Sequence, residues 1–333
     1  MFHFEAGSLE TQSAPFHSIN EFPGQSTAQA AGVRGEAAQR NSTAVIVSTR
    51  GRPGIVSSLV RQLAAQTQPP EHIFVIATAA ADVAELNPNQ KNLTVQIGRP
   101  GSTFQRNDGL ALAGSRFSYI VFFDDDFVPS RFWLERMAAV FASRPDIAGL
   151  TGTVLADGTT TAGVRLDEAQ SLVKLQDATP GHSDVVHDRF AYGCNVGCNM
   201  AFRYSAIKGI SFDERLPAYA WHEDSDFRGQ VERRGLVARA EALWGVHLGH
   251  KQGRGRGVTL GYSQIANAIY LGKKGTVPKR FLAGCATKNV LANALRSFRP
   301  EPFVDRRGRF QGNMMALADL VRGRMAPDRI SEL

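Results

Sequence analysis

Three consecutive aspartates, Asp124, Asp125 and Asp126, directly follow an apolar run from Tyr119 to Phe123. The run is rich in β-branched and aromatic residues, which is typical of a buried strand. Carboxylates gathered at the end of such a strand repel one another and lose hydration, so a bound cation would stabilise them. A solvated acidic turn is the alternative, because Asp is common in turns. We favour a metal site, since a plain turn seldom needs three carboxylates behind a buried strand.

The segments around these aspartates alternate between short apolar runs and stretches with helical spacing, which predict strands and helices respectively. The expected strands are 44–47, 72–76, 93–97 and 119–123, and the expected helices are 55–66, 103–113 and 130–141. Such alternation predicts an α/β fold with a mostly parallel sheet and helices on both faces. Ligands of open α/β sheets bind beyond the carboxyl ends of the strands, where the aspartates lie.

The second half of the chain has a weaker pattern, and we expect no definite element between Asp157 and Tyr192. A later helix opens with two adjacent acids, Glu223 and Asp224, and Gly235 should end it. The expected elements in this half are helices at 221–234, 262–271 and 288–298 and a strand at 236–246.

The composition, with 43% apolar and 21% charged residues, is typical of a soluble globular protein. No apolar run reaches the roughly 18–20 residues that cross a bilayer, and the N-terminus lacks the features of a secretory signal, so we expect a cytoplasmic protein. Residues 1–41 have a mixed polar composition that predicts a mobile arm. Cys194, Cys198 and Cys285 indicate neither a disulfide framework nor a zinc site.

Charge is distributed unevenly along the chain, whose net charge is +7. Residues 251–333 hold 16 Lys and Arg but 5 Asp and Glu, a net charge of +11. A basic tail predicts an anionic partner: nucleotide phosphate, an anionic membrane or nucleic acid. Nucleic acid is not expected, because the arginines are not interleaved with aromatic residues. Helix 288–298 has an apolar side, for which we favour packing on the rest of the protein over peripheral contact with an anionic membrane.

Five segments then occur in a definite order. They are Val45 to Arg50 with Pro53, Gln66 before Pro69 and Pro70, Gln105 to Gly109, Phe122 to Asp126, and Glu223 to Phe227. Together they resemble glycosyltransferase family 2 over roughly residues 43–275, with the aspartates as a DXD-like motif. The resemblance implies a Rossmann-like GT-A fold. Its nucleotide-sugar half would be 42–150 and its acceptor half 151–258, followed by a helical basic extension at 259–333.

The resemblance also implies a divalent metal, Mn2+ or Mg2+, beside a nucleoside-diphosphate sugar. Asp126 would bind the metal, Asp124 would lie near the metal and the ribose or sugar, and the role of Asp125 stays open. Similar enzymes often add a histidine ligand after the Glu-Asp segment, which here is His247 or His250, with spacing in favour of His247. An imidazole ligand suits Mn2+ better than Mg2+. The metal would offset the charge of the leaving diphosphate.

An acceptor hydroxyl must lose a proton as it attacks the anomeric carbon, and a carboxylate can take it. We expect Asp224 to be this general base, with the adjacent Glu223 as the alternative. Acids at a helix start also interact favourably with the helix dipole, so a structural role is the competing interpretation. A single displacement with one base would invert the anomeric centre, as the family resemblance also implies.

Further donor-binding residues are expected from similar proteins. Thr49 and Arg50 end the first strand, near the expected base and ribose, and Arg106 and Asn107 lie in a segment that fixes the donor. Arg106 could contact phosphate or pair with Asp124.

A glycine-rich basic loop with Arg254 and Arg256 could close over the diphosphate. Relatives commonly carry an acid for uracil at the end of the second strand; here the nearest acid is Asp82, which puts a uridine donor in doubt. Tyr219 and Trp221 could stack on an acceptor sugar, or pack in the core.

We therefore expect a metal-dependent inverting glycosyltransferase. It would move a sugar to a glycan or lipid-linked acceptor, as in bacterial surface polysaccharide assembly. A nucleotidyltransferase would share the metal and the nucleotide, but would leave Glu223 and Asp224 unexplained. A nucleic-acid-binding protein or a scaffold would leave the acidic clusters without a purpose.

Overall fold

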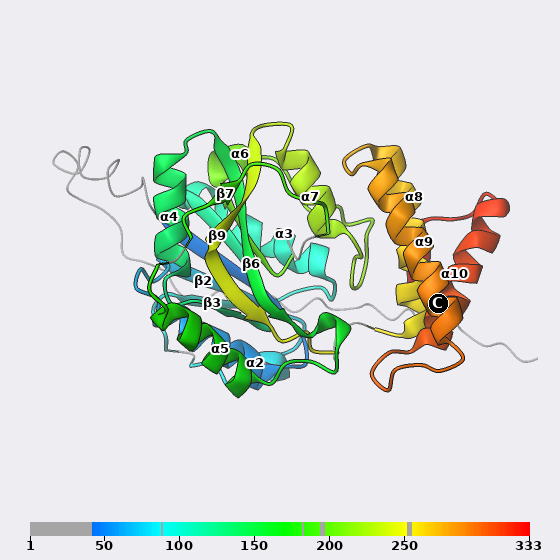
Figure 1. The fold of residues 1–333 in the computed structure, drawn as a ribbon, viewed down its shortest axis with the longest axis horizontal. Helices are drawn as coiled ribbons and strands as arrows, with labels where there is room; N and C mark the ends of the chain where they lie inside the picture. The colour runs from blue at the N-terminus through cyan, green and yellow to red at the C-terminus, as the bar shows by residue number, and fades with distance from the viewer. Residues whose placement is uncertain (1–41, 88, 182, 194–196, 252–254) are drawn as a thin grey trace, which may run out of the picture. The chain divides into compact units, whose positions relative to one another are not determined.

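The computed structural model describes residues 42–333, except 88, 182, 194–196 and 252–254. The arm predicted at residues 1–41 therefore lies outside the described residues. Within the described part, nine strands form one sheet in the order β3–β2–β1–β4–β8–β6–β9–β5, with β7 paired to β9 (Figure 1). The strands are β1 Thr43–Thr49, β2 His72–Ala77, β3 Leu93–Ile97, β4 Tyr119–Asp124, β5 Phe127–Pro129, β6 Ile147–Asp157, β7 Val186–His187, β8 Asn199–Arg203 and β9 Leu236–His247.

The sheet is mostly parallel, as the sequence predicts. Strands β3, β2, β1 and β4 run parallel to one another, and β6 pairs in parallel with β9. Strand β8 lies antiparallel between β4 and β6, and the short strands β5 and β7 pair antiparallel with β9. The main helices are α2 Pro53–Ala64, α3 Ser102–Ala113, α4 Trp133–Ser143, α5 Leu166–Ala178, α6 Tyr204–Ile207, α7 Glu223–Val231, α8 Gly257–Lys274, α9 Lys279–Arg296 and α10 Arg306–Val321.

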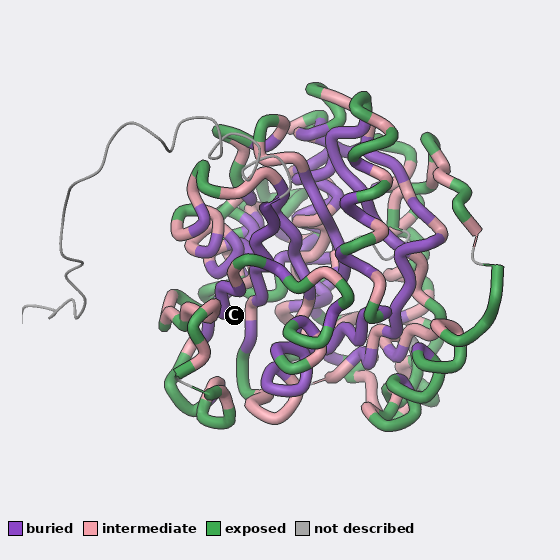
Figure 2. Tube along the Cα trace, turned by 90° about the vertical axis from the view of Figure 1, so that its left-hand side faces the viewer, coloured by how far each residue is buried: buried purple, intermediate pink, exposed green. Residues whose placement is uncertain are grey.

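Two cores form on opposite faces of the sheet, because successive residues of a strand point to opposite sides. Val47 and Phe123 belong to a core shared with α2 and α4. Ile46 and Phe122 belong to the other core, which α3 and α7 cover. Buried residues accordingly follow the strands (Figure 2). The central strands are covered on both sides, which explains why their sequences are continuously apolar.

Helix α5 lies in the region where the sequence indicates no definite element. Only Ala169 and Val173 of this helix are buried, while Leu175 is 69% exposed. The apolar stripe is therefore narrow and interrupted, so its helical period is weak in the sequence.

Three helices, α8, α9 and α10, follow β9 and lie beside one another (Figure 1). Helix α8 contacts two cores: Ala268 and Leu271 pack with Leu216 and Ala220, whereas Tyr262 belongs to a core shared with α10. The boundary expected between residues 258 and 259 falls in the first turn of α8, and α9 begins well before the expected residue 288. Among the described helices, none has the length and hydrophobicity that crossing a bilayer requires.

Candidate active site

Strand pairing brings Asp126, Asp157 and His247 together at one edge of the sheet. Asp157 is the last residue of β6 and His247 the last residue of β9, and the two are register partners in this parallel pair. Phe127, which directly follows Asp126, pairs with His247 in the antiparallel ladder of β5 and β9. The ends of β6 and β9 and the start of β5, which are distant in sequence, therefore lie side by side.

Asp124, Asp126 and His247 form a group in which one ligand atom from each residue lies within 4.8 Å of the others. His247 Nε2 lies 3.3 Å from Asp126 Oδ1 and 3.8 Å from Asp124 Oδ2. Two carboxylate oxygens and an imidazole nitrogen fit a divalent cation, and the imidazole fits Mn2+ better than Mg2+. The structure thus gathers the three residues that the sequence predicts as metal ligands. His250 instead donates its backbone N–H to Asp126 Oδ2, at 2.8 Å.

Asp157, which the sequence analysis does not identify, orients His247 from behind. Asp157 Oδ1 lies 3.2 Å from His247 Nδ1, and it accepts the backbone N–H of Thr159 at 2.9 Å. Burial raises the pKa of Asp157, but hydrogen bonds from His247 and Thr159 outweigh it and lower this pKa to about 2. A carboxylate on the second ring nitrogen fixes the tautomer and aim of a metal-binding histidine. Asp157 could have been found as an acid at the end of a strand, but the sequence did not predict the strand that precedes it.

Asp125 is not part of this group and is held by two side chains. Thr49 Oγ1 donates a hydrogen bond to Asp125 Oδ2 at 2.7 Å, and Arg52 Nη2 lies 2.7 Å from Asp125 Oδ1. Arg52 Nη1 also lies 3.2 Å from Asp126 Oδ2. Burial raises the pKa of Asp125 to about 7, although Arg52 opposes the shift. These contacts hold the Asp125 carboxylate in place beside the group. Arg52, which no sequence pattern singles out, contacts both Asp125 and Asp126.

Neighbouring side chains offset part of the negative charge of the group. Burial opposes ionisation of Asp126, but hydrogen bonding and charge from His247, together with Arg52, hold its pKa below the ordinary range. Burial likewise opposes protonation of His247, but Cys198, Asp126 and Asp157 raise its pKa well above the ordinary value. The carboxylates thus favour the protonated ring of His247, whereas metal binding would require the neutral imidazole.

Arg106 connects Asp124 of the candidate metal site to the first turn of α7. Its Nη2 lies 2.9 Å from Asp124 Oδ1, and its Nη1 lies 2.8 Å from Glu223 Oε1. Nη2 also donates to the carbonyl of Gly197 at 3.0 Å. Burial raises the pKa of Glu223 to about 8, although the charge of Arg106 lowers it. Arg106 therefore acts as a buried carboxylate bridge, which is one of the two roles that the sequence leaves open.

The three acids of α7 have different surroundings. Glu223 is engaged by Arg106, whereas Asp224 Oδ1 accepts the backbone N–H of Ser225 at 2.7 Å. Asp226 is fully buried and accepts hydrogen bonds from Lys274 at 2.8 Å and Gln230 at 2.9 Å. Asp226 is thus part of a structural ion pair, whereas Glu223 and Asp224 lie at the start of α7, where Arg106 binds Glu223.

The segment directly before α7 has an unusual backbone. Ala218, Ala220 and His222 have φ angles of 59°, 49° and 73°, in the left-handed region that residues with a side chain seldom adopt. The rings of Tyr219 and Trp221 lie 6.1 Å apart, and buried Trp221 Nε1 has no hydrogen-bond partner within the described structure. Strain of this kind is common beside active sites.

Several predicted donor residues lie away from the acidic group. Arg50 is exposed after β1. Asn107 donates to the carbonyl of Phe212 at 3.0 Å, and Arg256 donates to the main-chain oxygen of Leu333 at 2.8 Å. Arg254 lies outside the described residues.

Asp82 is also engaged, since its carboxylate accepts backbone N–H groups from Gly51 at 2.7 Å and from Thr78 and Ala79 at 2.9 Å. It therefore ties the loop after β1 to the end of β2.

Comparisons with known proteins identify the family and the fold. The sequence model of glycosyl transferase family 2 matches residues 44–210, half of the chain. The chain therefore belongs to glycosyl transferase family 2. A comparison with curated proteins gave no match.

Among solved structures, two of S. aureus TarS 1–349, one of them in complex with UDP-GlcNAc, align at a TM-score of 0.52. Each alignment covers 88% of this chain and 83% of the TarS chain, at 16% and 17% identity. The chain covers 36% of a longer TarS structure, at a TM-score of 0.45. The similarity to TarS 1–349 shows the fold, which is GT-A.

Proposed function

We propose that this protein is a metal-dependent, inverting glycosyltransferase that takes a sugar from a nucleoside-diphosphate donor. The observation that carries the proposal is that the buried side chain of Arg106 joins the candidate metal ligands to the acids at the start of α7. Arg106 bridges Asp124 of the metal group and Glu223, which is adjacent to Asp224. The candidate metal ligands and the candidate base are thereby held at one edge of the sheet.

In this proposal Asp124, Asp126 and His247 hold a divalent cation, with Mn2+ favoured, which offsets charge on the donor diphosphate. Arg52, Thr49 and Asp157 orient these ligands through the contacts described above.

Asp224 is the proposed general base, because Glu223 is already paired with Arg106. The acceptor hydroxyl would transfer its proton to Asp224, and the hydroxyl oxygen would bond to the anomeric carbon. The bond from that carbon to the nucleoside diphosphate would break at the same time, and the diphosphate would leave. A single displacement from the opposite face inverts that carbon.

We also propose that the acceptor is a glycan or a lipid-linked glycan, as in bacterial surface polysaccharide synthesis. It would bind beside the strained segment that carries Tyr219 and Trp221, since flat aromatic side chains can contact a sugar face. We propose that residues 42–150 bind the donor and residues 151–258 bind the acceptor, with the helical extension beginning at residue 259.

Thermal unfolding with nucleotides tests the donor site. The protein would be heated with UDP, GDP, dTDP or CDP, each with Mn2+ or with EDTA. A nucleotide at 100 times its Kd should stabilise the protein by about 2.7 kcal/mol. We expect the shift for one nucleotide, only with Mn2+, and its loss in Asp126→Asn.

The matched control is Asp167→Asn, because Asp167 is an exposed acid on α5 that pairs with Arg165. This variant should keep the full shift. An equal shift with EDTA, or no shift with any of the four nucleotides, would contradict the proposed metal-bound donor site.

A further inference from the structure

Helix α9 exposes apolar side chains that its sequence pattern predicts to be packed. Leu291, Leu295 and Phe298 are 55%, 73% and 83% exposed. They are spaced by four and three residues, so they follow one side of the helix. Val290 of the same helix packs against the core shared by α8 and α10. The packing that the sequence predicts is therefore found only in part, and the side that carries Leu295 and Phe298 is exposed.

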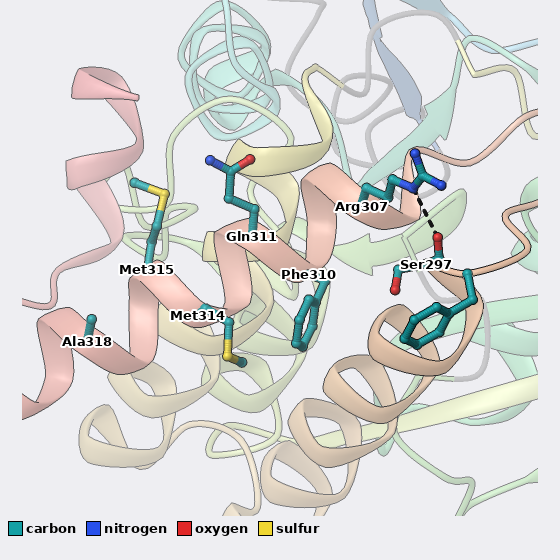
Figure 3. Close-up of a pocket in the computed structure, with 8 residues that line it drawn as sticks. Ser297, Arg307, Phe310, Gln311, Met314, Met315 and Ala318 are labelled. Atoms are coloured by element: carbon teal, nitrogen blue, oxygen red, sulfur yellow. Dashed lines mark hydrogen bonds between the residues drawn. The ribbon is translucent and has the colours of Figure 1, made fainter.

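A groove continues this surface onto α10. It has a volume of about 700 Å³ and is lined by Ser297, Phe298, Arg307, Phe310, Gln311, Met314, Met315 and Ala318. Phe310 and Met314 project from the same side of α10 (Figure 3). Farther along α10, Val321 is 88% exposed. We call this combined surface of α9 and α10 the apolar face.

Cations border the apolar face, while nearby acids are engaged by arginines. Lys288, Arg299 and Arg307 are exposed on or beside it. Glu301 is paired with Arg296 and Arg306, and Asp319 is paired with Arg324 and Arg329. The charge available to a partner at this surface is therefore positive.

We propose that the apolar face binds the surface of an anionic membrane. Apolar side chains bordered by basic residues match an interface where acyl chains lie below negative headgroups. A second copy of the chain fits less well, because two identical positive surfaces repel each other. The proposal concerns α9 and α10 and holds whether or not the donor-site assignment is correct.

Co-sedimentation of the full chain with vesicles tests the proposal. Vesicles of phosphatidylcholine would be compared with vesicles that also contain about one third phosphatidylglycerol. We expect binding to the anionic vesicles only, and a strong reduction at high salt, where surface charges are screened. Equal binding to both vesicle types, or binding to neither, would overturn the proposal.

Two variants separate the apolar and the electrostatic contributions. The double substitution Leu295→Ser and Phe298→Ser should reduce the partition coefficient at least tenfold, and Arg299→Gln with Arg307→Gln should reduce it severalfold. The matched controls are Leu175 of α5, which is 69% exposed, and Arg165, the exposed residue directly before α5. Leu175→Ser and Arg165→Gln should bind vesicles like the unchanged protein.

All variants should keep their unfolding temperature and their nucleotide-induced shift, which separates this test from that of the donor site. A dimer in solution that the Leu295 and Phe298 variant abolishes, without vesicle binding, would identify a second copy as the partner and overturn the membrane proposal.

Discussion

Asp224 and Asp226 lie two residues apart in α7, yet their surroundings differ. Asp226 is buried against Lys274, Gln230 and Thr276, whereas Asp224 lies beside Glu223 at the start of the helix. A substitution at each position therefore distinguishes a chemical role from a structural one, because both changes remove the same charge from the same helix.

We predict that Asp224→Asn reduces kcat at least about 100-fold, since general base catalysis contributes at least that factor. Its unfolding temperature should stay within a degree of the original. Asp226→Asn should instead lower stability by about 3 kcal/mol, because it breaks an ion pair whose carboxylate is fully buried and leaves the partly buried Lys274 with one partner fewer. Steady-state kinetics and calorimetric melting of both variants measure these effects. A stable Asp226→Asn protein would show that this ion pair contributes little.

Asp157 gives a second prediction at the scale of single residues. Asp157→Asn removes the negative charge behind His247, so it should weaken Mn2+ binding about 10–100-fold. Isothermal titration of the protein with Mn2+ measures this directly, without a sugar donor. The exposed Asp167→Asn variant serves as the control again. Unchanged Mn2+ affinity in Asp157→Asn would remove Asp157 from the proposed metal site.

Among the elements, α3 has a close contact with the sheet that depends on one glycine. A Cβ at Gly109 would lie 2.4 Å from Ile46 Cγ2, so the helix can approach β1 only without a side chain there. The same helix carries Arg106, and Gln105 donates hydrogen bonds to the carbonyls of Thr49 and Ile76. The distance of α3 from the sheet thus determines where Arg106 lies.

We predict that Gly109→Ala lowers stability by about 1–3 kcal/mol through overpacking. It should also weaken nucleotide binding, because α3 and Arg106 must shift. Gly284→Ala is the matched control, since nothing lies within 4 Å of a Cβ built at this helical position. That change should stabilise the protein by about 0.5–1 kcal/mol. Denaturant unfolding and the nucleotide shift of both variants give the comparison.

The whole molecule is basic, yet some of its carboxylates are strongly engaged. Hydrogen bonds from Arg306 and Arg296 lower the pKa of Glu301 to about 2, although burial opposes this. Burial would raise the pKa of Asp213, but hydrogen bonds from Lys274 and Tyr270 lower it. A group whose folded pKa is depressed stabilises the fold above its unfolded pKa.

The free energy of unfolding should therefore fall as the pH is lowered from about 4.5 towards 2. In this range Glu301 and Asp213 take up protons in the unfolded state before they do so in the folded state. The raised pKa values of Asp125 and Glu223 have the opposite effect on stability, because these groups bind protons more readily in the folded state. Their effect occurs at higher pH. Urea unfolding at several pH values measures the slope. The Glu301→Gln variant should be less stable than the unchanged protein at pH 6, and its stability should fall less steeply as the pH is lowered. An identical slope would assign the acid sensitivity to other carboxylates.

The sequence by itself determined the strands of the first half and the acidic segments, because apolar runs and strand ends are local features. It also named Asp124, Asp126 and His247 as a set, through order and spacing in a family pattern. Helix α5 was not predictable, since its apolar stripe is too narrow to produce a clear period.

Only the tertiary structure decided which side chains meet. The pairing of β6 with β9 and β5 places Asp157 beside His247, and no local pattern specifies that register. Asp125 is bound by Thr49 and Asp126 lies beside His247, although the two aspartates are adjacent and share Arg52. The exposure of Leu295 was likewise decided by how α8, α9 and α10 pack, because the same apolar spacing serves a buried face and an exposed one.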